Sequence, residues 1–409
     1  MNSGGIRMIL NNVRLVASIS GGTATECGHV VIKDGKIASV AARPLSDSQL
    51  EEAAKAGEEI VDGEGRTLIP GLIDAHTHLV GLLGIGTGHG SDGMAVLVDA
   101  AAQAPKYLTY GFTTIRDCGS SFGCANYVRD MVKKGAITGP DIIACGPTMG
   151  VSIYHKKGME EGIHNFYDGE DSFRKGVREH IADGADFIKI YASGSAANPK
   201  GVPMYPTMTR AEIDAVTDAA NSNGLYVAAH CHADKAIRDC AESGVYTIEH
   251  ATYLSEETAD YINSKEDCYI VPTLAAMYVS QEDPVERAFW LARLTPMLEA
   301  TAKTLGYAYR GNPKMGFGTD SAAGSKQYEF GVEFQFRKDY CKMKDEDILL
   351  QATRYSAEIL GIDKRVGAIK EGLNADLCLI NGKPDIDISC MYHRPYKVWK
   401  GGKLVAVNK

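Results

Sequence analysis

Two histidines separated by one residue, His76 and His78, stand at the end of the apolar run GLIDAHTHL. On an extended segment, residues i and i+2 project from the same face, so both imidazoles reach the same point. Neutral imidazoles are common ligands of Zn²⁺. The pair therefore indicates half of a metal site, although by itself it is explained equally well by a polar strand end facing solvent.

Four more residues able to bind a metal lie near the carboxyl ends of later apolar runs. They are Lys189, His230, His250 and Asp320. Taken singly, each has a structural explanation: a core histidine, a helix cap, or a lysine that extends from the outer face of a strand. Together with the histidine pair they predict a site for two divalent cations, with Zn²⁺ expected.

Lys189 lies between Ile188 and Ile190, which places its side chain inside the fold if the isoleucines face outward. A buried ammonium is costly unless it is paired. A lysine that has reacted with carbon dioxide carries an anionic carbamate instead, and its two oxygens can bridge two cations. We therefore expect N6-carboxylysine at position 189.

Asp320, in the segment FGTDS, is suited to proton transfer. One carboxylate oxygen can bind a cation, while the other takes a proton from a bridging water that the two cations acidify. Asp320 would then pass this proton to the leaving amine. The expected reaction is amide hydrolysis by a metal-bridging hydroxide, with Asp320 as the catalytic proton shuttle.

The central part of the chain alternates short apolar runs with amphipathic segments that end at glycine, such as 171–184, 209–224 and 233–244. The apolar runs cover residues 71–79, 112–117, 141–146, 186–192, 225–232, 246–251, 268–274 and 314–320. Eight strands alternating with helices predict an α/β fold, a (β/α)8 TIM barrel whose active-site face lies at the carboxyl ends of its strands. An open, doubly wound sheet is the structural alternative.

Both ends of the chain carry short alternating segments separated by turns such as Asp34-Gly35 and Asp62-Gly63. Each end alone has too few strands to be stable. We therefore expect one small β-sandwich assembled from both termini, from residues 1–66 and 363–409, with the barrel at 67–362.

The bulk composition fits an enzyme acting on a small molecule. The 409 residues carry a net charge of −9, which argues against nucleic acid as the main partner. We find no apolar run of the ~20 residues needed to cross a bilayer and no signal peptide. The ten cysteines lack CxxC pairs and are expected to be reduced, as in a cytoplasmic protein.

The segments PGLIDAHTHL, FIKIYASG, AAHCH, TIEHA and FGTDS resemble, in order, the metal-ligand motifs of the amidohydrolase superfamily. The terminal segment VGAIKEGLNADLCLI resembles the closing sandwich of the same family. The resemblance implies that His76, His78 and Asp320 bind one cation, that His230 and His250 bind the second, and that carboxylated Lys189 bridges both.

Within the superfamily, FTTIRDCGS and HCHADKAIRDCAESGVYTIEHA are most similar to an imidazolonepropionase-like group. This group contains binuclear zinc Xaa-Pro and Xaa-Arg or Xaa-Lys dipeptidases and ochratoxin-type amidases. The resemblance implies hydrolysis of the amide before a C-terminal amino acid, usually by an oligomer.

Three residues are expected to contact substrate. Prolidase-like members have a tyrosine where this chain has His232, so prolidase activity itself is in doubt. His155 is expected to supply an imidazole for the substrate carboxylate. Tyr191 should share a face with Lys189 and lie near the metals. Arg116 could bind a substrate carboxylate or be held structurally, and we favour the structural role.

The predicted function is hydrolysis of dipeptides or N-acyl amino acids. Hydrolysis of cyclic amides, as in imidazolonepropionase or hydantoinase ring opening, is the alternative that the sequence leaves open. Deaminases of the superfamily usually lack the bridging lysine, and non-catalytic relatives lose metal ligands, so Lys189 and the complete ligand set argue against both.

Overall fold

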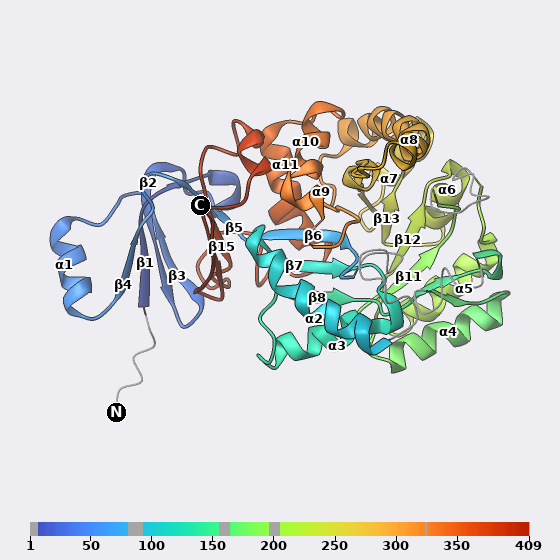
Figure 1. Ribbon diagram of the computed structural model, residues 1–409, viewed down its shortest axis with the longest axis horizontal. Coiled ribbons are helices and arrows are strands. Elements are labelled where there is room, and N and C mark those ends of the chain that lie inside the picture. The colour runs from blue at the N-terminus through green and yellow to red at the C-terminus, as the bar shows by residue number, and fades with distance from the viewer. Residues whose placement is uncertain (1–6, 81–92, 155–163, 196–204, 324, 409) are drawn as a thin grey trace. The chain divides into compact units, whose positions relative to one another are not determined.

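The structure is a computed structural model that describes residues 7–80, 93–154, 164–195, 205–323 and 325–408. The chain divides into two compact units, whose elements are labelled in Figure 1. One unit takes the described residues up to Ile73, together with Tyr107–Thr114 and those from Lys344 onward. The other takes the described residues of Asp74–Lys106 and Ile115–Met343. The two ends of the chain therefore fold together.

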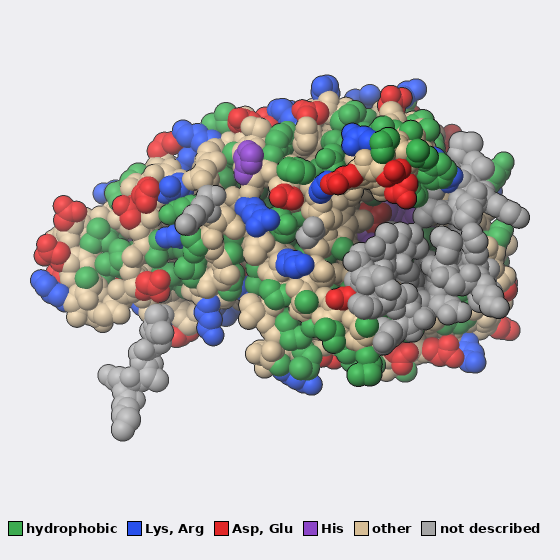
Figure 2. Space-filling model, viewed as in Figure 1, with side chains coloured by type: hydrophobic (Ala, Val, Ile, Leu, Met, Phe, Trp, Pro, Cys, Tyr) green, Lys and Arg blue, Asp and Glu red, His purple; other side chains and the backbone are tan. Residues whose placement is uncertain are grey.

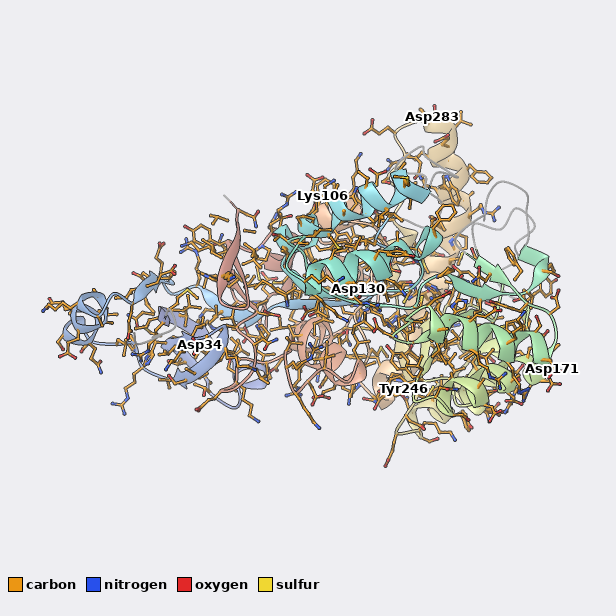
Figure 3. All side chains as sticks on the ribbon, turned by 90° about the horizontal axis from the view of Figure 1, so that it is seen from below. Asp34, Lys106, Asp130, Asp171, Tyr246 and Asp283 are labelled. Carbon is orange, nitrogen blue, oxygen red and sulfur yellow. The ribbon has the colours of Figure 1, made fainter. Side chains whose placement is uncertain are left out.

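The first unit is built on a sheet of strand order β17-β16-β15-β5-β1-β2-β3, in which β4 also pairs with β1. Its strands are β1 (Arg7–Leu15), β2 (Thr25–Lys33), β3 (Lys36–Ala41), β4 (Glu59–Asp62), β5 (Thr67–Pro70), β15 (Leu377–Ile380), β16 (Lys397–Lys400) and β17 (Lys403–Val407). Its helices are α1 (Asp47–Lys55), α11 (Asp345–Leu350) and α12 (Ser356–Ile359), with a π-helical segment at Gln351–Tyr355 between the last two and 3-10 turns at Ala17–Ile19 and Ile388–Tyr392. Asp34, labelled in Figure 3, and Gly35 form the predicted β2–β3 turn with positive φ of 53° and 76°.

One apolar core holds this sheet together. Leu10 and Val30 come from the N-terminal strands, Leu68 from β5, and Leu379 and Trp399 from the C-terminal strands, and all five are buried in the same cluster. Strands β5 and β15 pair antiparallel, from Thr67↔Ile380 to Pro70↔Leu377. Because the residues of this core and the strands of this sheet come from both ends of the chain, the predicted small β domain assembled from both termini is confirmed.

An ion pair reinforces this junction. Arg14 of β1 donates to both carboxylate oxygens of Asp385, at 2.6 and 2.8 Å, and the two residues are 371 positions apart. Both side chains are largely buried. Burial raises the pKa of Asp385, but the hydrogen bond from Arg14 outweighs it and the net pKa is lowered.

The larger unit contains the alternating strands and helices expected of the barrel. Strands β6 (Leu72–Thr77) and β7 (Phe112–Asp117) run into it from the first unit, and β6, β7 and β8 form one sheet. The remaining strands form a second sheet of order β10-β9-β11-β12-β13-β14. They are β8 (Asp141–Ala144), β9 (Thr148–Gly150), β10 (His164–Phe166), β11 (Ile188–Tyr191), β12 (Val227–Cys231), β13 (Thr247–His250) and β14 (Tyr269–Val271).

Backbone hydrogen bonds join these two sheets into a closed ring. Asp186, just before β11, donates to Ala144 O of β8 at 2.8 Å. On the other side, Gly316 N donates to Ile270 O of β14 at 3.0 Å, and Ala75 N of β6 donates to Phe317 O. The predicted strand 314–320 is therefore not a regular strand, but its backbone occupies the eighth position. The α/β (β/α)8 barrel is confirmed.

Helices follow the strands along the chain, and Figure 1 shows α4, α5 and α6 beside β11, β12 and β13. The helices are α2 (Gly93–Thr109), α3 (Cys124–Lys133), α4 (Glu170–Ala182), α5 (Arg210–Asn221), α6 (Asp234–Glu242), α7 (Glu256–Asn263), α8 (Pro284–Gly311), α9 (Lys326–Glu329) and α10 (Val332–Asp339), with 3-10 turns at Ser121–Gly123, Ser152–Tyr154 and Leu274–Met277. At α5, Thr209 and Glu212 form a capping box, which fixes where the helix begins.

No helix among the described residues is long and apolar enough to span a membrane. The domain boundaries expected at residues 67 and 363 stay a prediction.

Candidate metal centre

The six predicted ligands lie on or just after five strand positions of the barrel. His76 and His78 lie at the end of β6 and just beyond it, Lys189 is inside β11, His230 is the last but one residue of β12, and His250 ends β13. Asp320 follows the irregular eighth segment. The other five side chains are fully or almost fully buried, and the side chain of Asp320 is 12% exposed. Figure 2 shows histidine and acidic side chains within a recess of this unit.

His76, His78 and Asp320 form one cluster. Asp320 Oδ1 lies 3.0 Å from His78 Nε2 and 3.4 Å from His76 Nε2. The backbone holds this geometry, because Thr319 N and Asp320 N both donate to His76 O. Asp320 has a φ of 54°, in the left-handed region, which aspartate enters more readily than most residues other than glycine. The eighth segment and β6 thus bring three ligand atoms to one point.

The charge balance in this cluster favours a cation. Burial lowers the pKa of His76, but Cys118, Glu249 and Asp320 outweigh that effect and raise it well above its usual value. Burial raises the pKa of Asp320, but the hydrogen bonds of His76 and His78 lower it well below its usual range. A divalent ion at Nε2 of His76 would supply the positive charge that this position attracts.

His230, His232 and His250 form a second cluster, in which the nearest ring nitrogens lie within 4.8 Å of one another. Burial lowers the pKa of His232 to about 4. Burial and the neighbouring imidazoles also hold the pKa values of His230 and His250 well below their usual range. Metal ligands of this type must be neutral, so all three imidazoles are ready to bind a cation.

Buried acceptors fix the ring orientation of these histidines. Nδ1 of His232 lies 2.8 Å from Thr252 Oγ1, and Nδ1 of His250 lies 2.6 Å from Thr273 Oγ1. These contacts leave Nε2 of each ring for a ligand. His230 differs, because its Nε2 lies 3.3 Å from the carbonyl of Gly194 and its Nδ1 is left for a ligand.

Lys189 is fully buried on β11, and its Nζ has no hydrogen-bond partner among the residues that the structure describes. The ring centroid of Tyr191 lies 5.9 Å from Nζ. Its charge acts on His76, His230 and Glu249. A buried unpartnered ammonium is expensive, and conversion to a carbamate between two cations would remove the cost.

Neutral imidazoles, a carboxylate and an unpartnered amine form a donor set that fits two divalent cations. Nitrogen and oxygen ligands of this kind suit zinc, and manganese or cobalt can share them. The residues present therefore fit the metals that the sequence predicts.

The predicted substrate contacts have different surroundings. Tyr191 is almost completely buried, and its ring stacks on His230 with centroids 4.2 Å apart. His232 sits inside the second cluster and contacts the rings of both His230 and His250. His155 lies outside the described residues. Contact of any of the three with substrate stays a prediction.

Arg116 and Glu249 form a buried pair near the centre. Arg116 donates to Glu249 Oε1 at 2.7 Å, and Glu249 Oε2 lies 2.6 Å from His76 Nδ1. Burial raises the pKa of Glu249, but Arg116 and His76 lower it to about 2. Arg116 is thus held structurally, as favoured from the sequence. Glu249 was not singled out in the sequence, although a glutamate inside an apolar strand is itself a signal.

A second set of buried hydrogen bonds, centred on Asp74, holds the backbone next to Asp320. Asp74 Oδ1 accepts hydrogen bonds from the backbone N–H groups of His76 and Thr319, and Oδ2 accepts from Thr319 Oγ1 and Tyr328 OH. Burial raises the pKa of Asp74 to about 6. Tyr328 comes from α9, and no spacing in the sequence connects it to Asp74.

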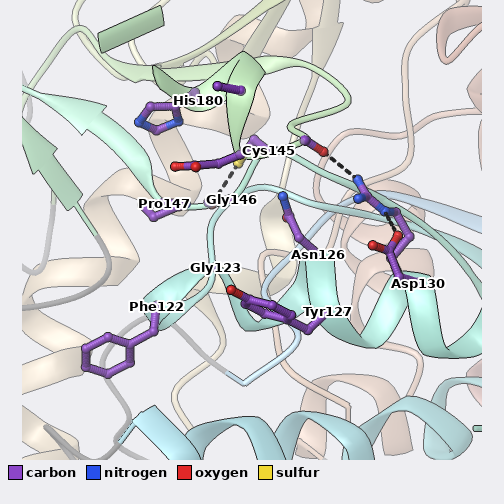
Figure 4. Close-up of a pocket in the computed structure, with 13 residues that line it drawn as sticks. Phe122, Gly123, Asn126, Tyr127, Asp130, Cys145, Gly146, Pro147 and His180 are labelled. Carbon is purple, nitrogen blue, oxygen red and sulfur yellow. Dashed lines mark hydrogen bonds and ion pairs between the residues drawn. The ribbon is translucent and has the colours of Figure 1, made fainter. Parts of the chain in front are cut away.

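A separate cavity of about 470 Å³ lies along α3 and the end of α4 (Figure 4). Asn126, Tyr127, Pro147 and His180 are among the residues that line it. None of the described site residues is among them. This cavity is therefore distinct from the histidine clusters.

Comparisons with known proteins identify the family of this chain. The model of the amidohydrolase family matches residues 67–405. Ochratoxinase from Aspergillus niger is 25% identical over 372 residues, which cover 82% of this chain and 75% of that protein. Imidazolonepropionase from Thermoplasma volcanium is 20% identical, over 93% of this chain and 91% of that protein.

Two solved structures of similar proteins cover nearly the whole chain. A prolidase complexed with N-methylphosphonate-L-proline has a TM-score of 0.84 and 26% identity, covering 98% of this chain and 100% of that one. A Xaa-Pro dipeptidase with bound methionine in its active site has a TM-score of 0.80 and 25% identity, covering 97% and 99%.

Proposed function

The chain belongs to the amidohydrolase family and is a hydrolytic enzyme acting on amide bonds, and we propose that it cleaves dipeptides or N-acyl amino acids at a centre of two divalent cations, with Zn²⁺ expected. In this proposal His76, His78 and Asp320 hold one cation. His230 and His250 hold the other, and Lys189, as N6-carboxylysine, bridges the two. When bound, the cations supply a water of lowered pKa and polarise the scissile carbonyl.

The buried environment of Lys189 carries the proposal. Its Nζ lies inside the barrel, its charge acts on residues of both histidine clusters, and it has no hydrogen-bond partner in the described part of the chain. An ammonium in that position destabilises the fold, whereas the charge of an anionic carbamate between the clusters would be balanced by the cations that it binds.

Asp320 is suited to move the proton. Its Oδ1 points at His76 and His78, and its Oδ2 lies 3.9 Å from His250 Nδ1, so the carboxylate spans both clusters. We assign to Oδ2 the transfer of a proton from the attacking water to the leaving nitrogen. The partial exposure of this side chain gives it access to a substrate, unlike the fully buried ligands.

The substrate class follows from the similar proteins and from the chemistry of the site. Prolidase, Xaa-Pro dipeptidase and ochratoxinase are names of proteins that this chain resembles over most of its length. We propose the same bond type here, an amide before a C-terminal amino acid. His232, Tyr191 and His155 are the proposed substrate contacts, and assembly into an oligomer in the cytoplasm is also proposed.

A substrate panel tests the function. Dipeptides and N-acyl amino acids varied at the C-terminal residue are compared with lactams and hydantoins, with kcat/KM as the measurement. We expect turnover of linear amides that depends on the C-terminal side chain. Turnover of the cyclic amides alone would overturn the proposal and establish ring opening instead.

A further inference from the structure

Glu249 occupies an unusual place at the end of β13. It is fully buried and directly precedes His250. His250 and Ala251 have φ values of 70° and 53°, so the strand turns sharply through left-handed backbone at this point. As a result, two consecutive side chains reach His76: Glu249 Oε2 lies 2.6 Å from its Nδ1, and the ring of His250 lies 4.8 Å from its ring.

Among the described histidines of the centre, only His76 has a charged hydrogen-bond partner outside the set of proposed ligands; Asp320, 3.0 Å from His78 Nε2, belongs to that set. Outside that set, the partners of the others are neutral: the carbonyl of Gly119 for His78, the carbonyl of Gly194 for His230, and threonine hydroxyls for His232 and His250. A carboxylate partner increases the electron donation of an imidazole to a metal, whereas a carbonyl or hydroxyl does so less. The two halves of the centre are therefore chemically unequal.

The hydrogen bonds around Glu249 also determine which nitrogen of His76 carries the proton. Oε1 accepts from Arg116 at 2.7 Å and from Thr247 Oγ1 at 2.6 Å. Arg116 has further bonds to Ala75 O and Thr247 Oγ1, so it cannot turn away. An ionised Glu249 only accepts, which leaves Oε2 to accept a proton from Nδ1 of His76. Nε2 is then the nitrogen left for a cation, and it faces the proposed ligand Asp320, whose Oδ1 lies 3.4 Å away.

We propose that Glu249 is a positioning residue that fixes the ring of His76 with Nε2 free, and that it makes the His76–His78–Asp320 half the tighter of the two metal sites. This inference rests on the proposed function, because it takes His76 as a metal ligand. Arg116 acts through Glu249 by holding its carboxylate in one orientation. The ion at His230 and His250 should consequently leave first when metal is withdrawn.

Glu249→Gln tests the inference with almost no change in shape. The amide oxygen must face the two donors, Arg116 and Thr247, because an NH₂ group there would oppose them. The amide NH₂ then faces Nδ1 of His76, which must accept instead of donate. The proton moves to Nε2, where it blocks the metal. We expect about a 10–100-fold loss of affinity in the tighter site.

The measurement is metal content during stepwise competition with a chelator, for Zn²⁺ and for Co²⁺, whose visible absorption reports the ligands directly. Wild-type protein should lose its ions in two separate steps. In Glu249→Gln the steps should merge, and the Co²⁺ bands of the tighter site should be lost. Two unchanged steps in the variant would overturn the inference.

Glu333→Gln is the matched control. Glu333 is also buried and ion-paired, accepting from Arg337 Nε at 2.7 Å and from Ala275 N at 2.7 Å. Its replacement should lower stability while leaving both metal steps unchanged. An equal loss of metal in this control would show that Glu249→Gln acts through general destabilisation, and would overturn the inference.

A double variant covers the case in which Glu249→Gln does not fold. Arg116→Met with Glu249→Met removes both charges and places no donor opposite Nδ1, so the tighter site should weaken less than in Glu249→Gln. Metal binding by this double variant equal to that of wild type would overturn the inference. A wild-type chain that binds no cation would instead overturn the proposed function.

Discussion

The ring of Tyr191 lies flat against the ring of His230, with centroids 4.2 Å apart and planes inclined by 10°. Both residues end neighbouring parallel strands and are in register in the sheet. The stack holds His230 in the plane that leaves Nδ1 available, because its Nε2 is occupied by the carbonyl of Gly194. Tyr191 therefore has a role in the centre, holding the ring of His230, that does not require contact with substrate.

Substitutions of Tyr191 distinguish its role in holding His230 from a contact with substrate. Tyr191→Leu removes the flat partner of His230 and should lower metal affinity in the second cluster by about 10-fold. Tyr191→Phe keeps the stack and should bind metal normally. If the hydroxyl also contacts substrate, Tyr191→Phe will raise KM with little change in kcat. Metal content and steady-state kinetics of both variants decide between the roles.

Metal content tests the bridged centre. We expect about two divalent ions per chain in the purified protein, and loss of activity when a chelator removes them. Activity should return when Zn²⁺, Mn²⁺ or Co²⁺ is added back. One ion per chain with full activity would contradict a lysine carbamate that bridges two cations.

Lys189→Ala should lose metal and activity together, because the bridging ligand is gone. A short carboxylate such as acetate or formate fits the space left by the side chain and should partly restore both. Lys326→Ala, at an exposed lysine paired with Glu282, is the control and should change neither. Failure of every short acid to restore metal binding would argue against a carboxylated lysine.

Asp320→Asn should keep most of its bound metal, since an amide oxygen can replace Oδ1 as a ligand. It should nevertheless lose about 10²–10⁴-fold in kcat, because the amide cannot accept the proton of the attacking water. Metal analysis and kcat are measured on the same preparation. A kcat near that of wild type would remove Asp320 from proton transfer.

The Arg14–Asp385 pair should give the small sheet a dependence on pH. The folded pKa of Asp385 is lowered below 3.8, so its contribution to stability is present above that value and is lost as the pH falls through the folded pKa. Asp385→Asn should lower the free energy of unfolding by about 1–3 kcal/mol at neutral pH. The difference from wild type should shrink at acid pH, as measured by urea denaturation.

Glu51→Gln is the control for this experiment. Glu51 and Lys55 are both strongly exposed, and their nearest charged atoms are 3.9 Å apart. Such a pair contributes little, so the change should cost less than about 0.5 kcal/mol at any pH. An equal effect in the two variants would show that burial of the Arg14–Asp385 pair has no special importance.

The fold could be predicted because hydrophobic periodicity sets it. The predicted strand 112–117 matches β7 fully, and the segments expected to be helical became α4, α5 and α6. The eighth predicted strand, 314–320, lies where it was expected but is not a regular strand, because Gly316 and Gly318 pack against Val271 and His76 without room for a side chain. The apolar run 141–146 was likewise predicted as one strand. In the structure β8 ends at Ala144, and β9 continues at the same position of the barrel.

The ligand residues could be predicted because each stands at the end of an apolar run. The contacts that orient them could not, because hydrogen bonds between segments far apart in the chain leave no spacing in the sequence. Glu249 meets His76 across 173 residues, and Tyr328 meets Asp74 across 254. Residues 81–92, 155–163 and 196–204, where substrate contacts such as His155 were expected, lie outside the described residues.

The pairing of β5 with β15 has a consequence for biosynthesis. Thr67 and its hydrogen-bond partner Gly382 are 315 residues apart, so at about 5–20 residues per second a ribosome needs roughly 15–60 s to make the chain between them. During that time one edge of β5, including Leu68 and Ile69, has no partner strand. A nascent chain in this state is open to aggregation, and its dependence on chaperones during translation should exceed that of the finished protein.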